Sequence, residues 1–335
     1  MIRLVQISIG QQRRVAAVEE PRLCLLAAVF ASTYSFAAAA VAGSTSISQL
    51  IEANKTAEYL DYDAVYGGKS PWKLLPPIDH PDEPGRCLVS GTGLTHLGSA
   101  RERQSMHMGA SDQALTDSMR MFRWGVEGGK PLAGEIGIAP EWFYKGNGTA
   151  LCAHNQPLDV PTYAEDGGEE AEIAGAYIIG ADGRPYRVGM AVGNEFSDHR
   201  FEKRNYLNLA GSKMRSCSLG PELVIDPEFK SIQGQVQIRR GNEVVWNKSL
   251  STGEAEMCHS LANLEHHHFK FEWHRRPGDV HVHFYGADSL SFGQGVELQD
   301  GDWMQISFQG FGRPLRNPLR KIAALDELIQ VAALK

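Results

Sequence analysis

The sequence predicts a strand-rich α+β fold, and three observations support that prediction. Glycine makes up 35 of the 335 residues, which favours a chain of many strands and turns over a helix bundle. Segments 172–179 and 186–192 flank a turn at 181–185 (ADGRP), which contains one glycine and one proline. Segments 233–239 and 244–250 flank a Gly-Asn turn. Both pairs are typical of β-hairpins. Amphipathic or alanine-rich stretches between such segments, for example 34–42, predict a smaller number of helices.

A proline-rich run at residues 71–84 is too kinked for a regular element and reads as a connector. We therefore expect two domains, a small N-terminal one at 1–80 and a larger one at 81–335. Within the first, the pattern predicts strands at 2–9 and 14–18, and a helix at 46–54 that continues to residue 60.

The larger part begins with a strand at 86–91. Four more elements are expected after it: helices at 114–124 and 251–265, and strands at 279–285 and 303–308. The amphipathic pattern of 320–334 predicts a terminal helix. Residues 144–148 (YKGNG) are expected to form a turn rather than a phosphate-binding loop.

Composition narrows the function classes. A net charge of −7 gives no reason to expect a nucleic-acid partner, because such proteins usually carry a basic face. The apolar stretch 22–43 is interrupted by polar residues and follows an acidic segment, so we expect a packed strand and helix and no membrane partner. Five scattered cysteines without a C-x-x-C motif predict free thiols in a cytoplasmic protein.

The residues that indicate chemistry are carboxylates. Glu170 and Glu172 are two positions apart, so in a strand both side chains point to the same face. Glu195 follows after the length of one hairpin and can close on them. Three carboxylates form an oxygen-only pocket that suits a hard cation such as Mg²⁺.

The neighbourhood of these acids resembles the fumarylacetoacetate hydrolase superfamily. Members carry Glu-x-Glu on one strand and a third carboxylate in an Asn-Asp-x-Ser-like segment downstream. Glu170 and Glu172 match the first element, and the segment from Asn194 to Ser197 matches the second, with Glu195 in place of the usual Asp. The resemblance implies a mixed β-roll with a smaller N-terminal α/β domain. It also implies a metal site of Glu170, Glu172 and Glu195 that takes Mg²⁺, with Mn²⁺ or Ca²⁺ as alternatives.

Two further segments fit the same family. Lys213, ahead of Gly220-Pro221, is similar to the family's lysine beside the metal and substrate, which implies a catalytic and substrate-binding role. The segment Gly286-Ala287-Asp288 is similar to its closing loop, which together with Ser197 implies substrate contacts. Two departures stand out: His199-Arg200 replaces the usual Arg-Asp, and Ala287 replaces a frequent Thr.

The reaction type is expected to depend on a lid segment. Hydrolases and decarboxylases of the superfamily carry His-x-x-Glu there, whereas this chain has Ser99-x-x-Glu102. That pattern resembles the branch that dehydrates 2-keto-3-deoxy sugar acids, and implies catalytic roles for Ser99 and Glu102, with Ser99 also contacting substrate. Ser99 and Glu102 also fit a plain helix start, and His96 is an alternative base.

The resemblance therefore implies a lyase, a Mg-dependent dehydratase of a 2-keto-3-deoxy sugar acid such as a pentonate, in carbohydrate catabolism. Its partner would be a small 2-keto acid, and the family implies a homo-oligomer, a dimer or a tetramer. Two alternatives stay open: a carbon–carbon bond hydrolase or decarboxylase acting on a 2,4-diketo acid, and a non-catalytic sugar-acid-binding protein.

Histidines form two short groups. The run His266-His267-His268 is expected to be solvated, because adjacent residues cannot share one helical face. His281 and His283 can share one face of a strand, but no third partner is near in sequence, so a core role is expected.

Overall fold

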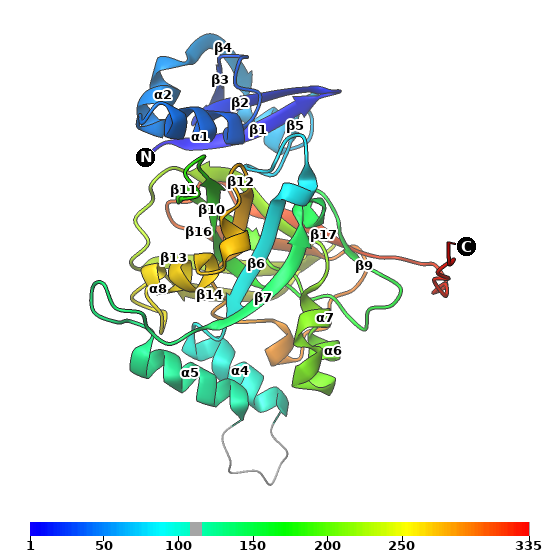
Figure 1. Ribbon diagram of the computed structural model, residues 1–335. Coiled ribbons are helices and arrows are strands. Elements are labelled where there is room, and N and C mark those ends of the chain that lie inside the picture. Colours follow the sequence, from blue (N-terminus) through cyan, green and yellow to red (C-terminus); the bar gives the residue numbers. More distant parts are fainter. Residues whose placement is uncertain (108–115, 335) are drawn as a thin grey trace.

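The computed structural model describes residues 1–107 and 116–334, and these fold into two β-sheets with helices around them (Figure 1). The predicted strand-rich α+β class is confirmed. Strands of the larger sheet are β1 (Arg3–Ile9), β2 (Gln12–Glu19), β3 (Arg22–Leu26), β4 (Lys55–Asp61), β5 (Lys73–Leu74), β6 (Cys87–Gly93), β7 (Glu141–Asn147), β8 (Leu151–Cys152), β10 (Ala171–Ile179), β11 (Pro185–Asn194), β12 (Cys217–Val224) and β15 (Val280–Phe284). Those of the smaller sheet are β9 (Leu158–Val160), β13 (Ile232–Arg240), β14 (Glu243–Thr252), β16 (Trp303–Phe308) and β17 (Leu315–Lys321).

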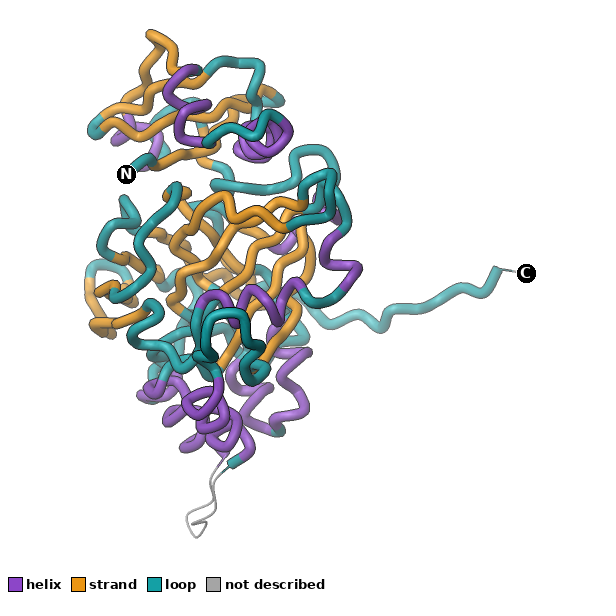
Figure 2. The backbone as a smooth tube through the Cα atoms, turned by 60° about the vertical axis from the view of Figure 1, so that its left-hand side comes forward, coloured by secondary structure: helices purple, strands orange, loops and turns teal. Residues whose placement is uncertain are grey.

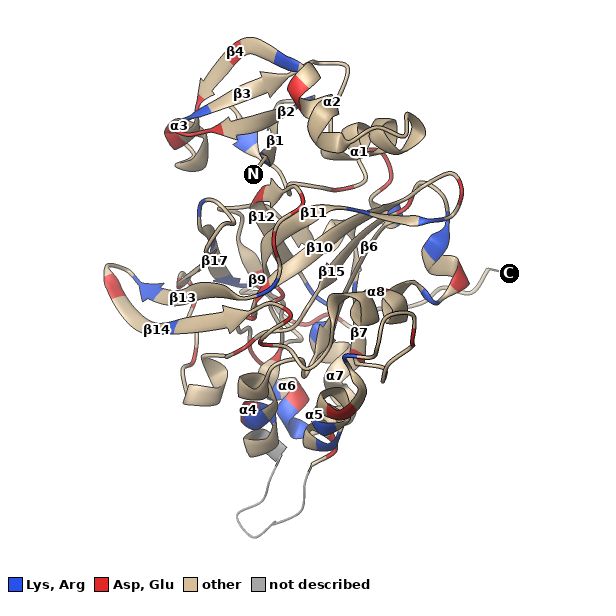
Figure 3. Ribbon diagram, turned by 90° about the vertical axis from the view of Figure 1, so that its left-hand side faces the viewer, with Lys and Arg blue, Asp and Glu red and all other residues tan. Residues whose placement is uncertain are grey.

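Helices lie around the sheets. They are α1 (Thr33–Ala42), α2 (Ile47–Ala53), α3 (Tyr62–Tyr66), α4 (Leu97–His107), α5 (Asp117–Gly128), α6 (His199–Arg204), α7 (Leu209–Lys213) and α8 (Leu261–Phe269), with short 3₁₀ helices η1 (Pro84–Arg86), η2 (Gly148–Ala150), η3 (Tyr206–Asn208), η4 (Glu272–Arg275) and η5 (Phe292–Gln294). Figure 3 shows α4, α5 and α6 at the end of the molecule opposite the N-terminal strands. Helix α6 carries both basic and acidic side chains.

The larger sheet runs in the order β4-β3-β2-β1-β12-β11-β10-β15-β6-β7, and the smaller in the order β14-β13-β16-β17-β9. The N-terminal strands form one end of the molecule (Figure 1) and join the rest through the β1–β12 pair, with Arg3 opposite Val224. The division into domains at residue 80 stays a prediction.

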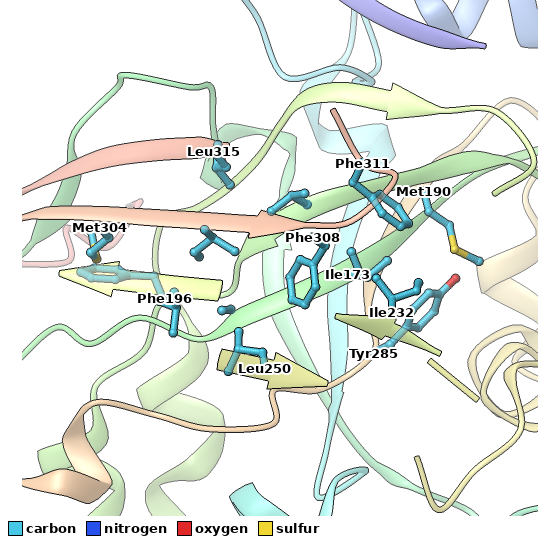
Figure 4. Packing of buried hydrophobic residues seen from close by; sticks show 14 of the residues in the cluster. Ile173, Met190, Phe196, Ile232, Leu250, Tyr285, Met304, Phe308, Phe311 and Leu315 are labelled. Atoms are coloured by element: carbon cyan, nitrogen blue, oxygen red, sulfur yellow. The ribbon is translucent and has the colours of Figure 1, made fainter. Parts of the chain in front are cut away.

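Strand β10 and the part of β11 from Val188 onward are buried on both faces, which explains their nearly continuous apolar sequence. Ile173 and Met190 point to a core shared with the smaller sheet, where Phe308 and Leu315 pack (Figure 4). Ala174 points to the opposite face, and belongs to a second core that also contains residues of the N-terminal strands. The hairpin is therefore fixed from both sides, and the residues at its open end are held rigidly.

Most expected elements are present, including both hairpins, the strands at 279–285 and 303–308, and the packed strand and helix within 22–43. Among the described residues no helix is long and apolar enough to cross a membrane. All five cysteines are free, as predicted, and four of them are buried.

Four element predictions are wrong. Residues 56–60 belong to β4, because they pair with β3 instead of extending α2. Helix α8 begins only at Leu261, where the Ser260 side chain caps it by accepting from the Asn263 amide. The expected start also contains Gly253, whose φ of 106° does not fit a helix. Residues 144–147 continue β7 rather than turning.

The fourth concerns the C-terminal segment. The stretch 315–321 is strand β17, and 322–334 has no regular structure and extends away from the body (Figure 2). Its apolar residues, for example Leu325 and Leu328, are exposed. Without a surface to pack against, an amphipathic pattern of this length does not hold a helix.

Candidate active site

Three glutamates meet at the open end of the β10–β11 hairpin. Glu172 lies in β10 opposite Gly193 of β11, and Glu170 and Glu195 lie just beyond the strands. The Glu195 amide donates to the Glu170 carbonyl at 2.9 Å, which brings the two side chains together. One carboxylate oxygen from each glutamate lies within 4.8 Å of the others, and all three residues are buried. The structure thus assembles the predicted carboxylate triad.

Two fully buried lysines contact the triad. Lys213, at the end of α7, forms ion pairs with Glu170 and with Glu195, the latter at 2.5 Å. Lys145, in β7, forms an ion pair of 2.5 Å with Glu195 and donates to the Phe196 carbonyl at 2.7 Å. The sequence predicted Lys213 but not Lys145, which lay in the segment taken for a turn.

Charge and burial set opposite pKa directions within the triad. Burial, with repulsion from Glu195 and Glu170, raises the pKa of Glu172 well above its usual range. Burial also acts to raise the pKa of Glu170, but the charge of Lys213 and other cationic neighbours outweigh it and hold the pKa well below normal. The pKa of Glu195 is raised, chiefly by burial. Glu172 is therefore the carboxylate least compensated by positive charge.

The lysines also differ. Burial acts to lower the pKa of Lys213, but the charges of Glu170 and Glu195 outweigh it and raise that pKa. For Lys145 burial dominates and lowers the pKa. The Lys213 ammonium also lies 4.7 Å from the centre of the Phe143 ring, a geometry that favours the charged form. Lys213 is thus held as a cation between two carboxylates.

His199 occupies the position where the family usually has Arg. Its Nε2 lies 3.1 Å from Glu170 Oε1. Burial alone would lower the pKa of His199, but the hydrogen bond to Glu170 and its charge raise it. The preceding Asp198 caps α6 through the Phe201 amide and forms a 3.0 Å ion pair with Arg215. The departure from the family pattern therefore adds a further partner to Glu170.

Ser197 and Gly286 also contact the triad. The Ser197 hydroxyl donates to both oxygens of Glu195, at 3.2 and 3.0 Å, and the Gly286 amide donates to Glu172 at 2.7 Å. Gly286 has a φ of 102°, and a Cβ there would lie 2.0 Å from the Thr95 hydroxyl. Only glycine allows this amide to reach Glu172.

The next two residues of the closing loop do not reach the triad. Ala287 is buried and has no hydroxyl, and Asp288 accepts a hydrogen bond of 3.1 Å from the Ser251 amide. Their predicted substrate contacts therefore stay predictions. The loop is fixed further along by Glu169, which accepts from the Ser291 amide at 2.8 Å and from its hydroxyl at 2.7 Å.

The lid pair Ser99 and Glu102 lies in α4. Glu102 accepts from the Ser289 hydroxyl at 3.0 Å and from the Leu290 amide at 2.9 Å, so it is attached to the closing loop. Burial raises the pKa of Glu102. The half-buried Ser99 donates to the His96 carbonyl at 3.2 Å within the first turn of the helix. Neither side chain has a hydrogen bond to the triad within the described part of the chain.

His96, the alternative base, is enclosed. Its Nδ1 lies 2.9 Å from the Thr95 hydroxyl and its Nε2 lies 3.1 Å from the Thr252 hydroxyl. Burial lowers the pKa of His96 to about 4. Both ring nitrogens are engaged and the ring is neutral near pH 7, so His96 acts as a structural residue that joins the start of α4 to β14.

A buried charge network that sequence reasoning missed connects α4 to the strand carrying Lys145. Arg103 of α4 contacts Glu141 of β7 at 2.9 Å and Glu202 of α6 at 2.9 Å, and the Tyr206 hydroxyl donates to Glu141 at 2.6 Å. The alternation of Glu141, Phe143 and Lys145 along β7 was the available signal, since it places three buried side chains on one face.

The triad fits a hard divalent cation. Its ligands are oxygens of three clustered carboxylates, the donor set that Mg²⁺ prefers. Three carboxylates and two ammonium groups carry a formal charge of −1, so a divalent ion would leave the site with +1. Burial, followed by repulsion from Glu195 and Glu170, raises the pKa of Glu172, and a cation bound there would offset both effects.

Comparison with known proteins identifies the fold. No family model and no curated protein matches this sequence, but solved structures do. A hexagonal crystal form of 2-keto-3-deoxyarabinonate dehydratase matches with a TM-score of 0.71 and 18% identity, covering 96% of this chain and 100% of that one. The 2-keto-3-deoxy-D-arabinonate dehydratase complexed with magnesium and 2,5-dioxopentanoate matches with 0.69 and 18%, over 96% and 99%.

A third similar structure is 2-hydroxyhepta-2,4-diene-1,7-dioate isomerase from Mycobacterium marinum, with a TM-score of 0.58 and 16% identity over 97% of this chain and 100% of that one. The protein therefore has the fumarylacetoacetate hydrolase-like fold that the sequence resemblance implied. Its similar structures are enzymes, but they include a dehydratase and isomerases, so the fold leaves the reaction open.

Proposed function

We propose that the protein is a Mg²⁺-dependent hydro-lyase that removes water from a 2-keto-3-deoxy sugar acid, most simply a pentonate. The observation that carries this proposal is the buried triad of Glu170, Glu172 and Glu195 with Lys213 against it. It lies in a fold shared with a dehydratase whose structure holds magnesium and 2,5-dioxopentanoate. That compound has the composition of a 2-keto-3-deoxypentonate less one water.

The charge of the site supports an anionic substrate. With a divalent cation the triad and its two lysines have a formal charge of +1, to which a protonated His199 adds one more, and a substrate carboxylate offsets this positive charge. Buried charge is tolerated only when compensated. A neutral sugar would leave this positive charge uncompensated.

The metal, when bound, supplies Lewis-acid polarisation of the substrate's 2-keto group. Lys213 remains an ammonium that holds Glu170 and Glu195 in place and stabilises negative charge as it develops on the keto oxygen. Ser197 and the Gly286 amide orient Glu195 and Glu172. These contacts fix the ligands before substrate binds, which lowers the reorganisation that the reaction requires.

Glu102 carries the proton in this proposal. Its carboxylate takes a proton from C3, and the same proton then leaves with the C4 hydroxyl as water. The C3–H and C4–O bonds break, while an O–H bond of water and a C3–C4 double bond form. Tautomerisation, which moves one hydrogen from C5 to C3 and one from the C5 hydroxyl to C4, would then give a 2,5-dioxo acid. The contacts with Ser289 and Leu290 place Glu102 on the loop that contains Gly286. Its raised pKa makes it a better proton acceptor than an ordinary glutamate. Ser99 would bind a substrate hydroxyl beside it.

A substrate screen tests the proposal. Purified protein with Mg²⁺ is incubated with each 2-keto-3-deoxypentonate and, separately, with a 2,4-diketo acid. We expect a product one water lighter from at least one pentonate, and no cleavage of the diketo acid. Cleavage of the diketo acid with every pentonate unchanged would replace the dehydratase with a carbon–carbon hydrolase or decarboxylase.

The enclosure of His96 favours the dehydratase over that rival. A water-activating histidine needs a free ring nitrogen near the metal, and both nitrogens of His96 are engaged by Thr95 and Thr252. A non-catalytic sugar-acid-binding protein would bind Mg²⁺ and a 2-keto acid without turnover.

We also propose that the enzyme is a cytoplasmic homo-oligomer, a dimer or tetramer, of carbohydrate catabolism.

A further inference from the structure

A second group of buried side chains lies apart from the carboxylate triad. His268 at the end of α8, His274 in η4 and His281 in β15 each place a ring nitrogen within 4.8 Å of the other two. Their exposed fractions are 1%, 4% and 0%. The prediction that His268 belongs to a solvated patch is wrong, because the ring points inward from α8 and stacks on His283 at a centroid distance of 4.3 Å.

Hydrogen bonds assign the lone pairs of the three rings. The Trp142 indole can only donate, and its Nε1 lies 3.2 Å from His268 Nδ1, so that nitrogen accepts and Nε2 carries the proton. Nε2 of His268 then donates to Nδ1 of His281 at 2.9 Å. Nδ1 of His274 donates to the His268 carbonyl at 2.7 Å, so in the neutral ring Nε2 carries the lone pair.

The protein alone does not satisfy this network. Nε2 of His281 and Nε2 of His283 are buried without a hydrogen-bond partner in the described part of the chain. Because Nδ1 of His281 accepts from His268, Nε2 of His281 carries the proton, so this buried donor calls for a water and is not itself a metal ligand. The rings therefore combine convergent nitrogens with incomplete hydrogen bonding.

We propose that His268, His274 and His281 bind a zinc ion, through Nε2, Nε2 and Nδ1 respectively. Three imidazoles are a ligand set for Zn²⁺ and not for Mg²⁺, which prefers oxygen. Tetrahedral Zn–N bonds of about 2.0–2.1 Å require nitrogens roughly 3.4 Å apart, so the 2.9 Å pair needs to open only slightly. Water would fill the fourth position.

The site is separate from the triad. His281 pairs with Tyr177 of β10, five residues from Glu172, which at the rise of a strand is roughly 17 Å. Zinc there would connect strand β15 of the larger sheet to two helical elements outside the sheets, α8 and η4. A water in the fourth position is typical of catalytic zinc, but all three rings are buried, so we assign the site a structural role, beyond the proposed reaction and independent of it.

Metal binding requires one change in the network. When Nε2 of His268 binds zinc, its proton moves to Nδ1, where the acceptor is the Ser90 hydroxyl at 3.4 Å. The Trp142 N–H and the new His268 Nδ1–H, which are both donors, then point toward each other. Trp142 should therefore weaken zinc binding, and its replacement by Phe, which keeps an aromatic ring without the N–H, should strengthen it.

Cobalt tests the proposal, because four-coordinate Co²⁺ bound by nitrogen has intense visible absorption and six-coordinate Co²⁺ bound by oxygen does not. The full chain carrying Glu172→Ala, which disables the triad, is titrated with Co²⁺ and then with Zn²⁺. We expect one equivalent of the intense form, displaced by one equivalent of Zn²⁺. His274→Ala and His281→Ala should lose it, and His266→Ala, a control on the same helix, should keep it.

The same titration gives two results that would overturn the site. These are absence of the intense form in folded protein, and its survival in both His274→Ala and His281→Ala. If those variants do not fold, Trp142→Phe decides by competition with a chelator. Zinc affinity should rise roughly 10-fold, the size of a typical effect from a residue that contacts a ligand, and an unchanged or lower affinity would contradict the assignment.

Discussion

The carboxylate triad and the histidine cluster are both buried groups of three convergent side chains, yet they differ in how neighbouring groups compensate their charge. Lys213 and Lys145 already compensate most of the charge of the triad. The histidine cluster has no charge to compensate, and its rings are joined mainly to one another and to Trp142. The first arrangement suits a cation that must meet an anionic substrate, and the second suits a cation that stays in place.

The difference shows how surroundings decide what a cluster of ligands does. The triad lies at the open end of a hairpin, with the Gly286 loop and α4 nearby, so that groups from several segments can meet a substrate. The histidines lie between a helix end and the middle of a strand. Chemistry is therefore expected at the first, and stabilisation at the second.

The largest expected effect comes from Glu172→Ala. Removing this ligand should abolish tight Mg²⁺ binding and lower kcat/KM by at least about 10³-fold, the upper range for losing one electrostatic contact to a transition state. Initial rates over a Mg²⁺ series measure it. His274→Ala is the matched control, and should keep Mg²⁺-dependent activity. Equal losses in the two variants would show that the two clusters do not act separately.

Glu102→Gln should be next in size. Losing the proton carrier should lower kcat by about 10²–10⁴-fold and leave Mg²⁺ affinity unchanged, because Glu102 contacts the closing loop and not the triad. Steady-state kinetics and Mg²⁺ calorimetry separate the two quantities. Ser99→Ala, one turn away on α4, should lose less than Glu102→Gln. A larger loss for Ser99→Ala would exchange the two roles.

The two lysines should differ when each is replaced by Met. Lys213→Met removes ion pairs to two buried carboxylates, Glu170 and Glu195, whereas Lys145→Met removes one ion pair, to Glu195, which keeps Lys213. Breaking a buried pair costs about 3–5 kcal/mol, so the free energy of unfolding should fall more for Lys213→Met. Urea denaturation measures both, and Mg²⁺ should recover part of the loss. The reverse order would mean that Lys145 is the main counter-charge.

The smallest effect concerns two buried histidines outside both clusters. Burial lowers the pKa of His96 to about 4 and that of His154 to about 3. In the unfolded chain both take up protons below about pH 6.5, so the unfolded state binds more protons and stability falls as pH drops from 6.5 toward those values. Each should contribute about 1.4 kcal/mol per pH unit.

Urea midpoints between pH 7 and pH 4.5 check this. His96→Gln should give a shallower decline than the wild type, while above pH 7 the two curves should run parallel. Parallel curves over the whole range would mean that His96 does not stay neutral in the folded protein.

Sequence could predict the triad and Lys213 because each belongs to a local pattern: two acids on one strand face, a hairpin of definite length, a lysine before a Gly-Pro turn. Lys145 was missed because its segment has the glycine and asparagine typical of a turn, and only pairing of β7 with β6 makes it a strand. The terminal helix was wrongly expected because periodicity does not show whether a packing surface exists.

The histidine cluster could not be predicted for a related reason. His281 and His283 share a strand face, as the spacing indicated, but the partners come from α8 and η4, whose positions depend on the tertiary fold. The same holds for Arg103, whose partners Glu141 and Glu202 lie far along the chain. Contacts between distant segments leave no local signature.

The most direct test of the proposed reaction follows one 2-keto-3-deoxypentonate by NMR with the wild-type enzyme and Mg²⁺. We expect a C3 proton and the C4 hydroxyl to be lost together, at a rate that vanishes when the divalent ion is chelated and in Glu172→Ala. Two results would contradict the proposed reaction. One is turnover that proceeds unchanged without a divalent ion, and the other is cleavage of a carbon–carbon bond while C3 and C4 keep their substituents.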